Sequence, residues 1–429
     1  MRISPSLTPF NAVSFRTSLS TKSGIETTVG FPMGRVESVV LFALPALATL
    51  TIWCTDPLWN WASEAGMLLL ASLVSVRAYV RKIRYNMLFP IGAIAAWGFL
   101  QLALGWTVYR YATLDAALRL AACASVAFSA AALLSVRQRR EEWLRWFSWF
   151  AVVVGLVSVL AYHTSPGKIL WIVPGIYPDN WGPFPSRNNF AQFLELSFPV
   201  AVYQFDLGWG RERRDEARCL AALAPALLFA CGVASASRAG SAILTLEALW
   251  MTVLMWRRMR KALAGLVLAT GALIFVMGAG TLVARLGEPD PLSVRREIFR
   301  SVWAMVQSRP WTGYGLGTFS DVYPGFAEFD PGTRVEHAHN DWLEWTSEGG
   351  IPFAALWAFF AIFIVRRALR PIWGVGILAV LVHALVDYPF ARLGITAWFF
   401  ALAGALLSVE HGVGSDRGPE AAEKKWRWV

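Results

Sequence analysis

The chain has 429 residues, of which 56% are hydrophobic and only 16% are charged, and its net charge is +10. A soluble domain usually carries about 25% charged residues, so this composition argues against a soluble protein and indicates a membrane protein. The excess of Lys and Arg does not indicate a nucleic-acid partner, because the basic residues lie in short clusters between apolar runs, as in loops that set membrane topology.

Twelve apolar segments follow one another along the chain, and each is a candidate membrane helix because a bilayer span takes roughly 20 mostly apolar residues. They cover residues 37–54, 60–78, 86–106, 113–135, 144–163, 189–208, 219–236, 239–256, 262–282, 350–365, 371–388 and 395–409. We expect a flexible cytoplasmic tail at 1–35, a transmembrane domain at 36–410 and a second cytoplasmic tail at 411–429. The predicted fold class is all-α, a polytopic membrane protein of about 12 helices.

Basic clusters mark every second loop between these segments. They lie at residues 81–84, 137–140, 211–214, 257–261 and 366–370. Short loops rich in Lys and Arg stay in the cytoplasm. Both termini are therefore expected in the cytoplasm, and an even number of spans agrees with this topology.

Two of the outward loops are long, residues 164–188 and residues 283–349, and a long loop in a compact protein is usually either functional or disordered. The second loop contains Ser293–Ser308, in which apolar residues recur at helical spacing and Arg295 and Arg296 occupy other positions. This pattern predicts an amphipathic helix at the outer membrane–water boundary.

Arginines gather on the outward side, against the usual distribution of positive charge. They are Arg187, Arg238, Arg285, Arg295, Arg296, Arg309 and Arg334. Because a guanidinium group bonds two phosphate oxygens at once, such a group of arginines is what an enzyme needs to hold a lipid-linked diphosphate. For any single arginine, pairing with a lipid head group or an acidic side chain is the alternative.

The stretch HAHNDWLEWTSEGG begins with two histidines, His337 and His339. A His-x-His pair could bind zinc, but no third ligand follows at the spacing of a zinc site. A neutral His could instead act as a general base toward a sugar hydroxyl. Asp341, Glu344 and Glu348 could serve glycoside hydrolysis, but their i, i+3, i+7 spacing predicts a solvent-facing helix surface.

Taken together, these motifs resemble the O-antigen ligase and polymerase superfamily of bacterial membrane glycosyltransferases. The resemblance rests on GPFPSRNNFAQFLELSFP, ASASRAG, VRREIFRSVWAMVQSRPWTGYGLGTF and HAHNDWLEWTSEGGIP, in the family's order. HALVDYPF is similar to a late family helix that ends in Asp, and His383 and Asp387 within it share one helix face. The similar segments span about residues 180–400.

The resemblance implies transfer of a glycan from an undecaprenyl-diphosphate carrier at the periplasmic face of the bacterial inner membrane, with no metal and no cofactor. The acceptor would be lipid A–core or protein for a ligase, and another lipid-linked glycan for a polymerase. By the resemblance, Arg238 and Arg295 bind and stabilise the diphosphate, and His339 orients or deprotonates the acceptor hydroxyl. Further substrate-binding roles are expected for Arg187, Asn189, Arg296 and Asn340.

The chain also departs from the family pattern. Ala239 separates Arg238 from Gly240 where the family has Ser-Arg-Gly, and Phe299 stands where Trp is usual. Phe353 occupies a position where many ligases have a smaller residue or Tyr, so a polymerase stays open as the alternative to a ligase.

A flippase or transporter for lipid-linked glycans is the alternative from another functional class. Such a protein should carry charged residues within its helices along a central path. Most charges of this chain gather instead at the predicted outer ends and in the two outer loops, with Glu195, Asp206 and Glu247 as exceptions. This distribution favours an enzyme.

Overall fold

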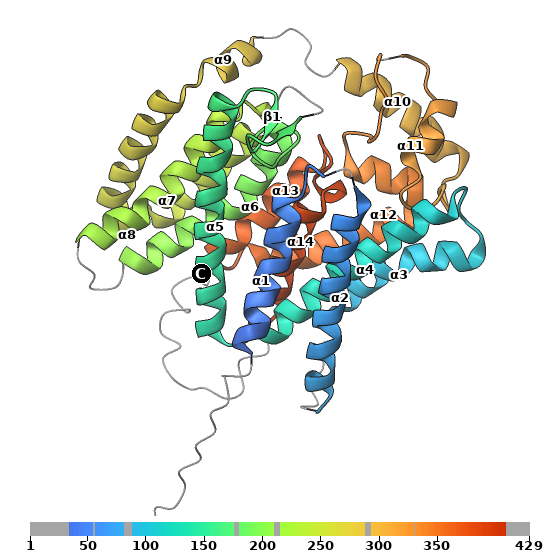
Figure 1. Ribbon diagram of the computed structural model, residues 1–429, viewed down its shortest axis with the longest axis horizontal. Coiled ribbons are helices and arrows are strands. Elements are labelled where there is room, and N and C mark those ends of the chain that lie inside the picture. The colour runs from blue at the N-terminus through green and yellow to red at the C-terminus, as the bar shows by residue number, and fades with distance from the viewer. Residues whose placement is uncertain are drawn as a thin grey trace, which may run out of the picture.

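The computed structural model describes residues 34–408 apart from 55, 81–87, 176–179, 210–214, 288–292 and 331, so the predicted tails at 1–35 and 411–429 lie almost entirely outside the described residues. The fold is all-α, as predicted. Its longer helices are α1 (Arg35–Leu50), α2 (Pro57–Val80), α3 (Phe89–Leu104), α4 (Arg110–Leu133), α5 (Arg137–Thr164), α6 (Arg187–Trp209), α7 (Asp215–Ala234), α8 (Arg238–Met277), α10 (Ser293–Ser308), α12 (Asp341–Ala368), α13 (Val375–His383) and α14 (Leu393–Ser408) (Figure 1). Shorter elements are β1 (Lys168–Ile169), β2 (Val173–Pro174), α9 (Gly280–Leu286) and α11 (Phe319–Val322).

Each of the twelve predicted apolar segments falls on a helix. Within the described residues, five helical stretches are long and apolar enough to cross a membrane, and four shorter helices are also apolar. The second half of α8 shows what such a stretch looks like, because Val267, Leu268 and Phe275 are apolar and exposed. An exposed apolar helix surface is suited to lipid. The structure thus describes a membrane-embedded protein, and the count of twelve spans stays a prediction.

Helix α8 includes two of the predicted spans. Forty residues of straight helix would extend about 60 Å, yet Nη1 of Arg238 at its start lies 3.0 Å from the carbonyl oxygen of Arg285, eight residues beyond its end. Eight residues reach at most about 29 Å. The chain must therefore reverse within α8, and Figure 1 shows its later, yellow part rising along the left edge of the molecule to α9. The basic residues 257–261 lie between the two spans, as predicted.

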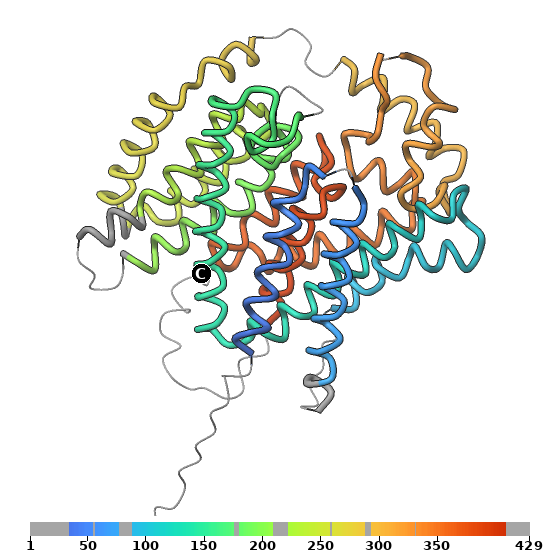
Figure 2. Tube along the Cα trace, in the orientation of Figure 1, coloured from blue at the N-terminus to red at the C-terminus, as the bar shows by residue number. Residues whose placement is uncertain are grey.

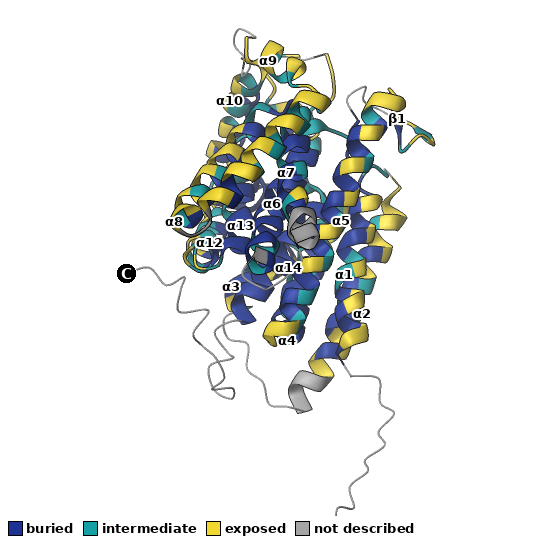
Figure 3. Ribbon diagram, turned by 90° about the vertical axis from the view of Figure 1, so that its left-hand side faces the viewer, coloured by how far each residue is buried: buried dark blue, intermediate teal, exposed yellow. Residues whose placement is uncertain are grey.

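Helix α14 forms the centre of the bundle, and every one of its residues is buried. It contacts α1, α4, α6 and α12. In Figure 2 its red trace lies behind the blue N-terminal helices, and in Figure 3 the ribbons around it are largely dark blue, the colour of buried residues. Gly404 permits the close packing with α4, because a Cβ atom there would overlap the carbonyl oxygen of Ala127.

The two long loops lie at one end of the molecule. Figures 1 and 3 both show β1, α9 and α10 at the upper end of the view. The first loop folds into a two-stranded antiparallel ribbon of β1 and β2, and the second carries α9, α10 and α11. Both loops can therefore contribute to one site, as the predicted topology requires. Which side of a membrane this end faces stays a prediction.

Helix α10 confirms the predicted amphipathic helix, but its apolar face does not lie open to a membrane. Ile298, Val302 and Met305 are buried in a separate small core formed by the loop itself. Tyr314 and Phe319 belong to the same core. This apolar face therefore does not lie against the membrane–water boundary, where we expected it. Its residues hold the loop together and set the position of α10.

Helix α12 follows the two histidines and breaks at Gly350, whose backbone has φ 77° and ψ 174°. The break lets Ile351 N–H donate a hydrogen bond to the Pro310 carbonyl at 2.7 Å. A Cβ atom on Gly350 would overlap the carbonyl oxygen of Trp311, and a positive φ favours glycine in any case. The break therefore clamps the loop after α10 onto α12.

Candidate active site

His339 lies directly before the N-cap of α12 and forms the centre of the polar site. Its Nδ1 is 3.0 Å from Oδ1 of Asp387, and a third of its side chain is exposed, against 2% for the aspartate. His339 also has φ +52°, a conformation that is rare for residues with a side chain and often accompanies functional sites. The surrounding structure thus holds this histidine in an unfavourable backbone conformation with one ring nitrogen bound.

Asp387 lies beyond the end of α13 and is buried between three elements. Its N–H bonds to the carbonyl of His383 at 3.0 Å, which continues the helical path past α13. Its Oδ2 accepts a hydrogen bond from Nε2 of Gln192 at 3.2 Å, and Nη2 of Arg295 lies 4.0 Å from Oδ1. Burial alone raises the pKa of a carboxyl group, but the hydrogen bond with His339 and the positive charges nearby outweigh it and hold the pKa of Asp387 below its usual value.

An ionised Asp387 settles which nitrogen of His339 carries the proton. A carboxylate has no proton to donate, so Nδ1 of His339 must be the donor. Neutral His339 then has its lone pair on Nε2, the ring nitrogen that Asp387 does not touch. This is the arrangement in which an aspartate orients a histidine that acts as a general base.

Arg295 and Arg296 occupy neighbouring positions at the start of α10 but differ in their surroundings. Nη1 of Arg295 donates to the carbonyl of Val386 at 2.6 Å, so its guanidinium group points at the segment that carries Asp387. Arg296 is exposed. The structure thus brings Arg295 together with His339 on one aspartate. The roles that the resemblance implies for these two residues stay predictions.

The first turn of α6 joins this aspartate to the rest of the site. Asn189 is fully buried, accepts from the Ser186 hydroxyl at 2.9 Å and donates to Oε1 of Gln192 at 3.1 Å. Gln192 in turn donates to Asp387. Asn189 therefore supports Asp387 through Gln192, and Arg187, the first residue of α6, is partly exposed beside it.

Arg238 is the first residue of α8, and the residue before it contacts the first turn of α6. The hydroxyl of Ser237, the N-cap of α8, donates to Oδ1 of Asn188 at 2.8 Å. Arg238 donates to the Arg285 carbonyl at 3.0 Å, and Nη1 of Arg285 donates to the Ala236 carbonyl at 2.7 Å. These reciprocal bonds hold two guanidinium groups near the start of α8. Asn188, which Ser237 contacts, is next in sequence to Asn189, which belongs to the network that reaches Asp387.

His337, to which the sequence assigned no role, forms a pair of its own. Its Nδ1 is 3.0 Å from Oε1 of Glu344, and its ring stacks on Tyr388 with 4.4 Å between centroids. The same tyrosine meets the ring of His339 edge-on at 5.0 Å. Asn340 caps α12 by accepting from Leu343 N–H at 3.0 Å. The loop is thus fixed on both sides of His339.

The predicted solvent-facing surface of Asp341, Glu344 and Glu348 is wrong, because all three side chains are buried. Each carboxyl group accepts a backbone N–H from another segment: Asp341 from Phe390 at 3.0 Å, Glu344 from Ala338 at 2.6 Å and Glu348 from Phe319 at 2.9 Å. The helical spacing was right, but this face of α12 turns toward loop segments whose backbone donors need acceptors.

Asp387 and Gln192 are the site residues that the sequence did not select. Asp387 shares a predicted helix face with His383, yet nothing in the sequence pairs it with a histidine 48 positions earlier. Gln192 lies in the motif at the start of α6, and an amide within a predicted membrane helix is the signal that could have found it.

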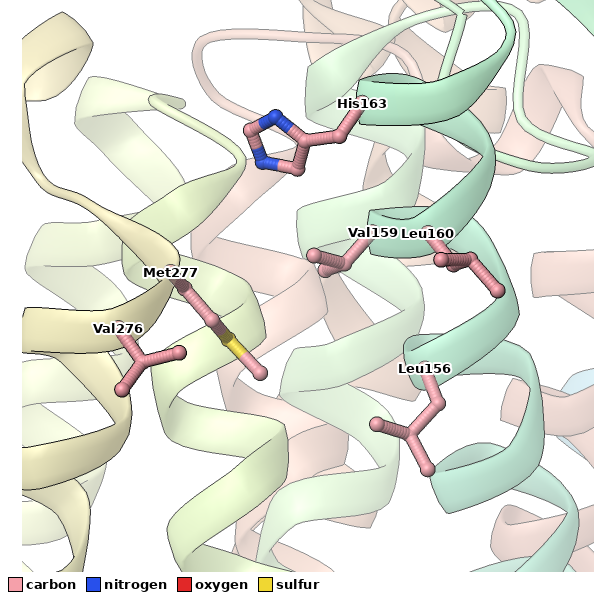
Figure 4. A pocket seen from close by; sticks show the side chains of 6 residues that line it. All are labelled: Leu156, Val159, Leu160, His163, Val276 and Met277. Atoms are coloured by element: carbon pink, nitrogen blue, oxygen red, sulfur yellow. The ribbon is translucent and has the colours of Figure 1, made fainter.

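An apolar groove of about 360 Å³ lies apart from this network. Its lining is Leu156, Val159, Leu160 and His163 of α5 with Val276 and Met277 of α8. Figure 4 shows the His163 ring directed into the space between the two helices. None of the predicted site residues lines this groove. Among the described residues, no group of three His, Cys, Asp or Glu side chains is placed to hold a metal ion, and metal independence stays a prediction.

The fold and the site together define a membrane-embedded protein with a His–Asp pair and several arginines at one end of its bundle. Residues 223–358 match the profile of the O-antigen ligase family. This match, over part of the chain, supports its similarity to the O-antigen ligase and polymerase superfamily. Members of the matched family are membrane glycosyltransferase-like enzymes. The matched part includes Arg238, Arg295 and His339, whereas Asp387 and α6 lie outside it. No curated protein matches the chain.

Proposed function

We propose that the protein transfers a glycan from an undecaprenyl-diphosphate carrier to an acceptor hydroxyl at the periplasmic face of the inner membrane. The observation that carries the proposal is the hydrogen bond between His339 and the buried Asp387. It supports a histidine whose Nε2 is not bound by the aspartate and whose side chain is partly exposed, beside arginines suited to a diphosphate. The donor, the acceptor and the side of the membrane belong to the proposal.

In the proposed reaction, Nε2 of His339 removes the proton of the acceptor hydroxyl. The acceptor oxygen forms a bond to the anomeric carbon of the glycan, while the bond from that carbon to the diphosphate oxygen breaks. The diphosphate leaves with the electron pair of that bond. Asp387 stabilises the imidazolium that forms on His339. Direct displacement inverts the configuration at the anomeric carbon, so a product of retained configuration would contradict this mechanism.

The arginines act on the leaving group. A diphosphate departs readily when fixed cations stabilise the charge that develops on it. Arg238 and Arg295 are proposed to do this, with Arg187 and Arg296 in supporting contacts. Arg295 uses one N–H group in its hydrogen bond to the Val386 carbonyl, but a guanidinium group has five donors. The Asn340 side-chain oxygen caps α12, so its amide nitrogen is the group proposed to face substrate.

A polymerase would use the same site with another lipid-linked glycan as acceptor. Phe353, whose identity weakened the similarity to ligases, is buried and stacks on Trp97 with 6.0 Å between ring centroids. Its role is packing within the bundle, so it does not decide between the two acceptors. Deleting the gene does: accumulated unligated polymer indicates a ligase, and accumulated single repeat units indicate a polymerase.

The orientation is tested by labelling introduced cysteines. Ser135→Cys lies in the connection from α4 to α5, and Glu336→Cys lies in the second long loop; both positions are exposed. After the native cysteines are replaced, a membrane-impermeant maleimide should label position 336 in intact spheroplasts and position 135 only after permeabilisation. The reverse pattern would overturn the proposed periplasmic site.

The chemistry is tested by His339→Ala in purified protein supplied with a lipid-linked glycan donor. Loss of a general base should lower kcat by about 10²- to 10⁴-fold. Normal insertion and an unchanged melting temperature are the controls. A fully active His339→Ala protein would remove His339 from the mechanism.

A further inference from the structure

A fully buried histidine–carboxylate pair lies deeper in the bundle than the proposed active site. Nδ1 of His383 is 2.7 Å from Oε1 of Glu195, and both side chains are fully buried between α13 and α6. Burying such a pair costs solvation free energy that the attraction between the partners often fails to return. Ionisable groups inside a membrane bundle therefore usually have a functional reason. The proposed reaction does not use either residue.

The pair lies in register with the hydrogen bond that supports Asp387. On α6, Gln192 and Glu195 are three residues apart, and after α13 the chain keeps its helical path so that His383 and Asp387 are four apart. Residues at these spacings lie one above the other on a helix. Glu195–His383 and Gln192–Asp387 are thus two successive contacts between the same two segments.

Close backbone packing makes this contact a narrow one. Gly376 of α13 lies against α6, where a Cβ atom would come within 2.5 Å of the Glu195 carbonyl oxygen and 2.8 Å of Leu196 Cα. With the backbones this close, the side chains at His383 and Glu195 set how far α13 rotates and slides on α6. Helix α8 contacts both α6 and α13 and carries another buried carboxyl group, that of Glu247.

We propose that Glu195 and His383 are positioning residues: their buried pair fixes the end of α13 on α6, so that Asp387 meets His339. The inference rests on the proposed role of His339 as general base. The pair touches no substrate. Without the pair, only the contact between Gln192 and Asp387 joins the end of α13 to the side chains of these two α6 positions. Asp387 then no longer holds His339 in one orientation.

The first test replaces both partners by apolar residues of similar size, Glu195→Met with His383→Leu. An apolar replacement of a whole buried pair usually leaves a fold as stable as before or more so. We expect an unchanged or higher melting temperature, a kcat for glycan transfer at least about tenfold lower, and a donor KM within about twofold. Wild-type kcat would overturn the proposal. A much lower melting temperature would also overturn it, because the pair would then serve the fold.

The second test asks whether the pair acts through Asp387. In an Asp387→Asn background, the double substitution should cause no further fall in kcat, because the carboxylate it positions is gone. Losses that multiply would show an independent role and contradict the proposal. Ser197→Ala, a buried α6 residue bonded to the Leu194 carbonyl, is the matched control and should leave kcat unchanged.

These outcomes are separate from the fate of the proposed function. If His339→Ala is fully active, the proposed base is wrong whatever the pair does. If His339→Ala is inactive and the apolar pair variant keeps wild-type kcat, the base stands and the positioning role fails.

Discussion

His337 and His339 are two residues apart in one loop and contact the same tyrosine, yet the structure uses them differently. His337 pairs with Glu344, seven positions along the chain, and stacks flat on Tyr388. His339 pairs with Asp387, which comes from another helix end 48 positions away, and has a positive φ. One pair closes a local turn, and the other joins separate parts of the bundle.

The difference shows why a His-x-His motif does not by itself indicate a symmetrical or metal-binding site. A contact within one loop forms wherever that loop folds. A contact across the bundle requires α6, α10 and α13 to be in place, and it holds an unfavourable backbone conformation. The second kind of contact is where we place the chemistry.

Asp387→Asn should have the largest effect among the residues that support His339. An amide can donate to Nδ1 and so favour the wrong tautomer of the imidazole. We expect kcat to fall by about 10²- to 10³-fold, with little change in the donor KM. The measurement is steady-state transfer by purified protein. Glu344→Gln, the same change beside His337, is the matched control, and equal losses in both variants would remove the distinction between the two pairs.

Arg238→Lys should have a smaller but clear effect, because it changes the leaving-group side of the site and leaves both histidine pairs intact. A lysine places a single charge where a guanidinium group bonds two oxygens. A loss of about 10- to 100-fold in kcat/KM is expected from one charge-assisted hydrogen bond. Arg300→Lys, an exposed residue of α10 paired with Glu297, should have wild-type activity. Full activity of Arg238→Lys would show that Arg238 does not bind the diphosphate.

The stability of the His339–Asp387 contact should depend on pH in a definite direction. The pKa of Asp387 is lower in the folded protein than its usual value near 3.8. Its contribution is therefore complete above about pH 4 and is lost as pH falls through the lower, folded value. The melting-temperature difference between wild type and Asp387→Asn should not shrink between neutral pH and about pH 4, and it should shrink below that pH. A difference that shrinks already near neutral pH would contradict the lowered pKa.

His337→Phe should have the smallest effect. A phenyl ring keeps the stacking on Tyr388, and Glu344 still accepts from Ala338 N–H at 2.6 Å. We expect kcat within about threefold of wild type and a small fall in melting temperature. A loss as large as that of His339→Ala would place His337 in the chemistry and merge the two pairs into one site.

The sequence was sufficient to predict where the helices lie and to select one of the two residues in each central contact. Apolar runs located the helices because a membrane span leaves a long signature in the chain. His339, Arg295 and Arg238 followed from their motifs. Arg295 and His339 do meet at Asp387, and Ser237, the residue before Arg238, contacts Asn188 in the first turn of α6.

The partners of those residues could not be predicted, because they depend on packing between distant segments. Gln192 reaches Asp387 across 195 positions of sequence, and Glu195 meets His383 across 188. For the same reason, the sequence could not show that Asp341, Glu344 and Glu348 of α12 are buried. Helical spacing shows that they share a face, but only the folded loop shows that this face is covered by backbone donors.

The most direct test compares His339→Gln with His337→Gln in purified protein, with the same lipid-linked donor and hydroxyl acceptor. Glutamine retains hydrogen bonding but has no basic nitrogen, so the comparison isolates the base from the contact. We expect kcat of His339→Gln to be at least about 10²-fold below that of His337→Gln, while both proteins insert and melt alike. Equal kcat values for the two variants would contradict the assignment of His339 as the base.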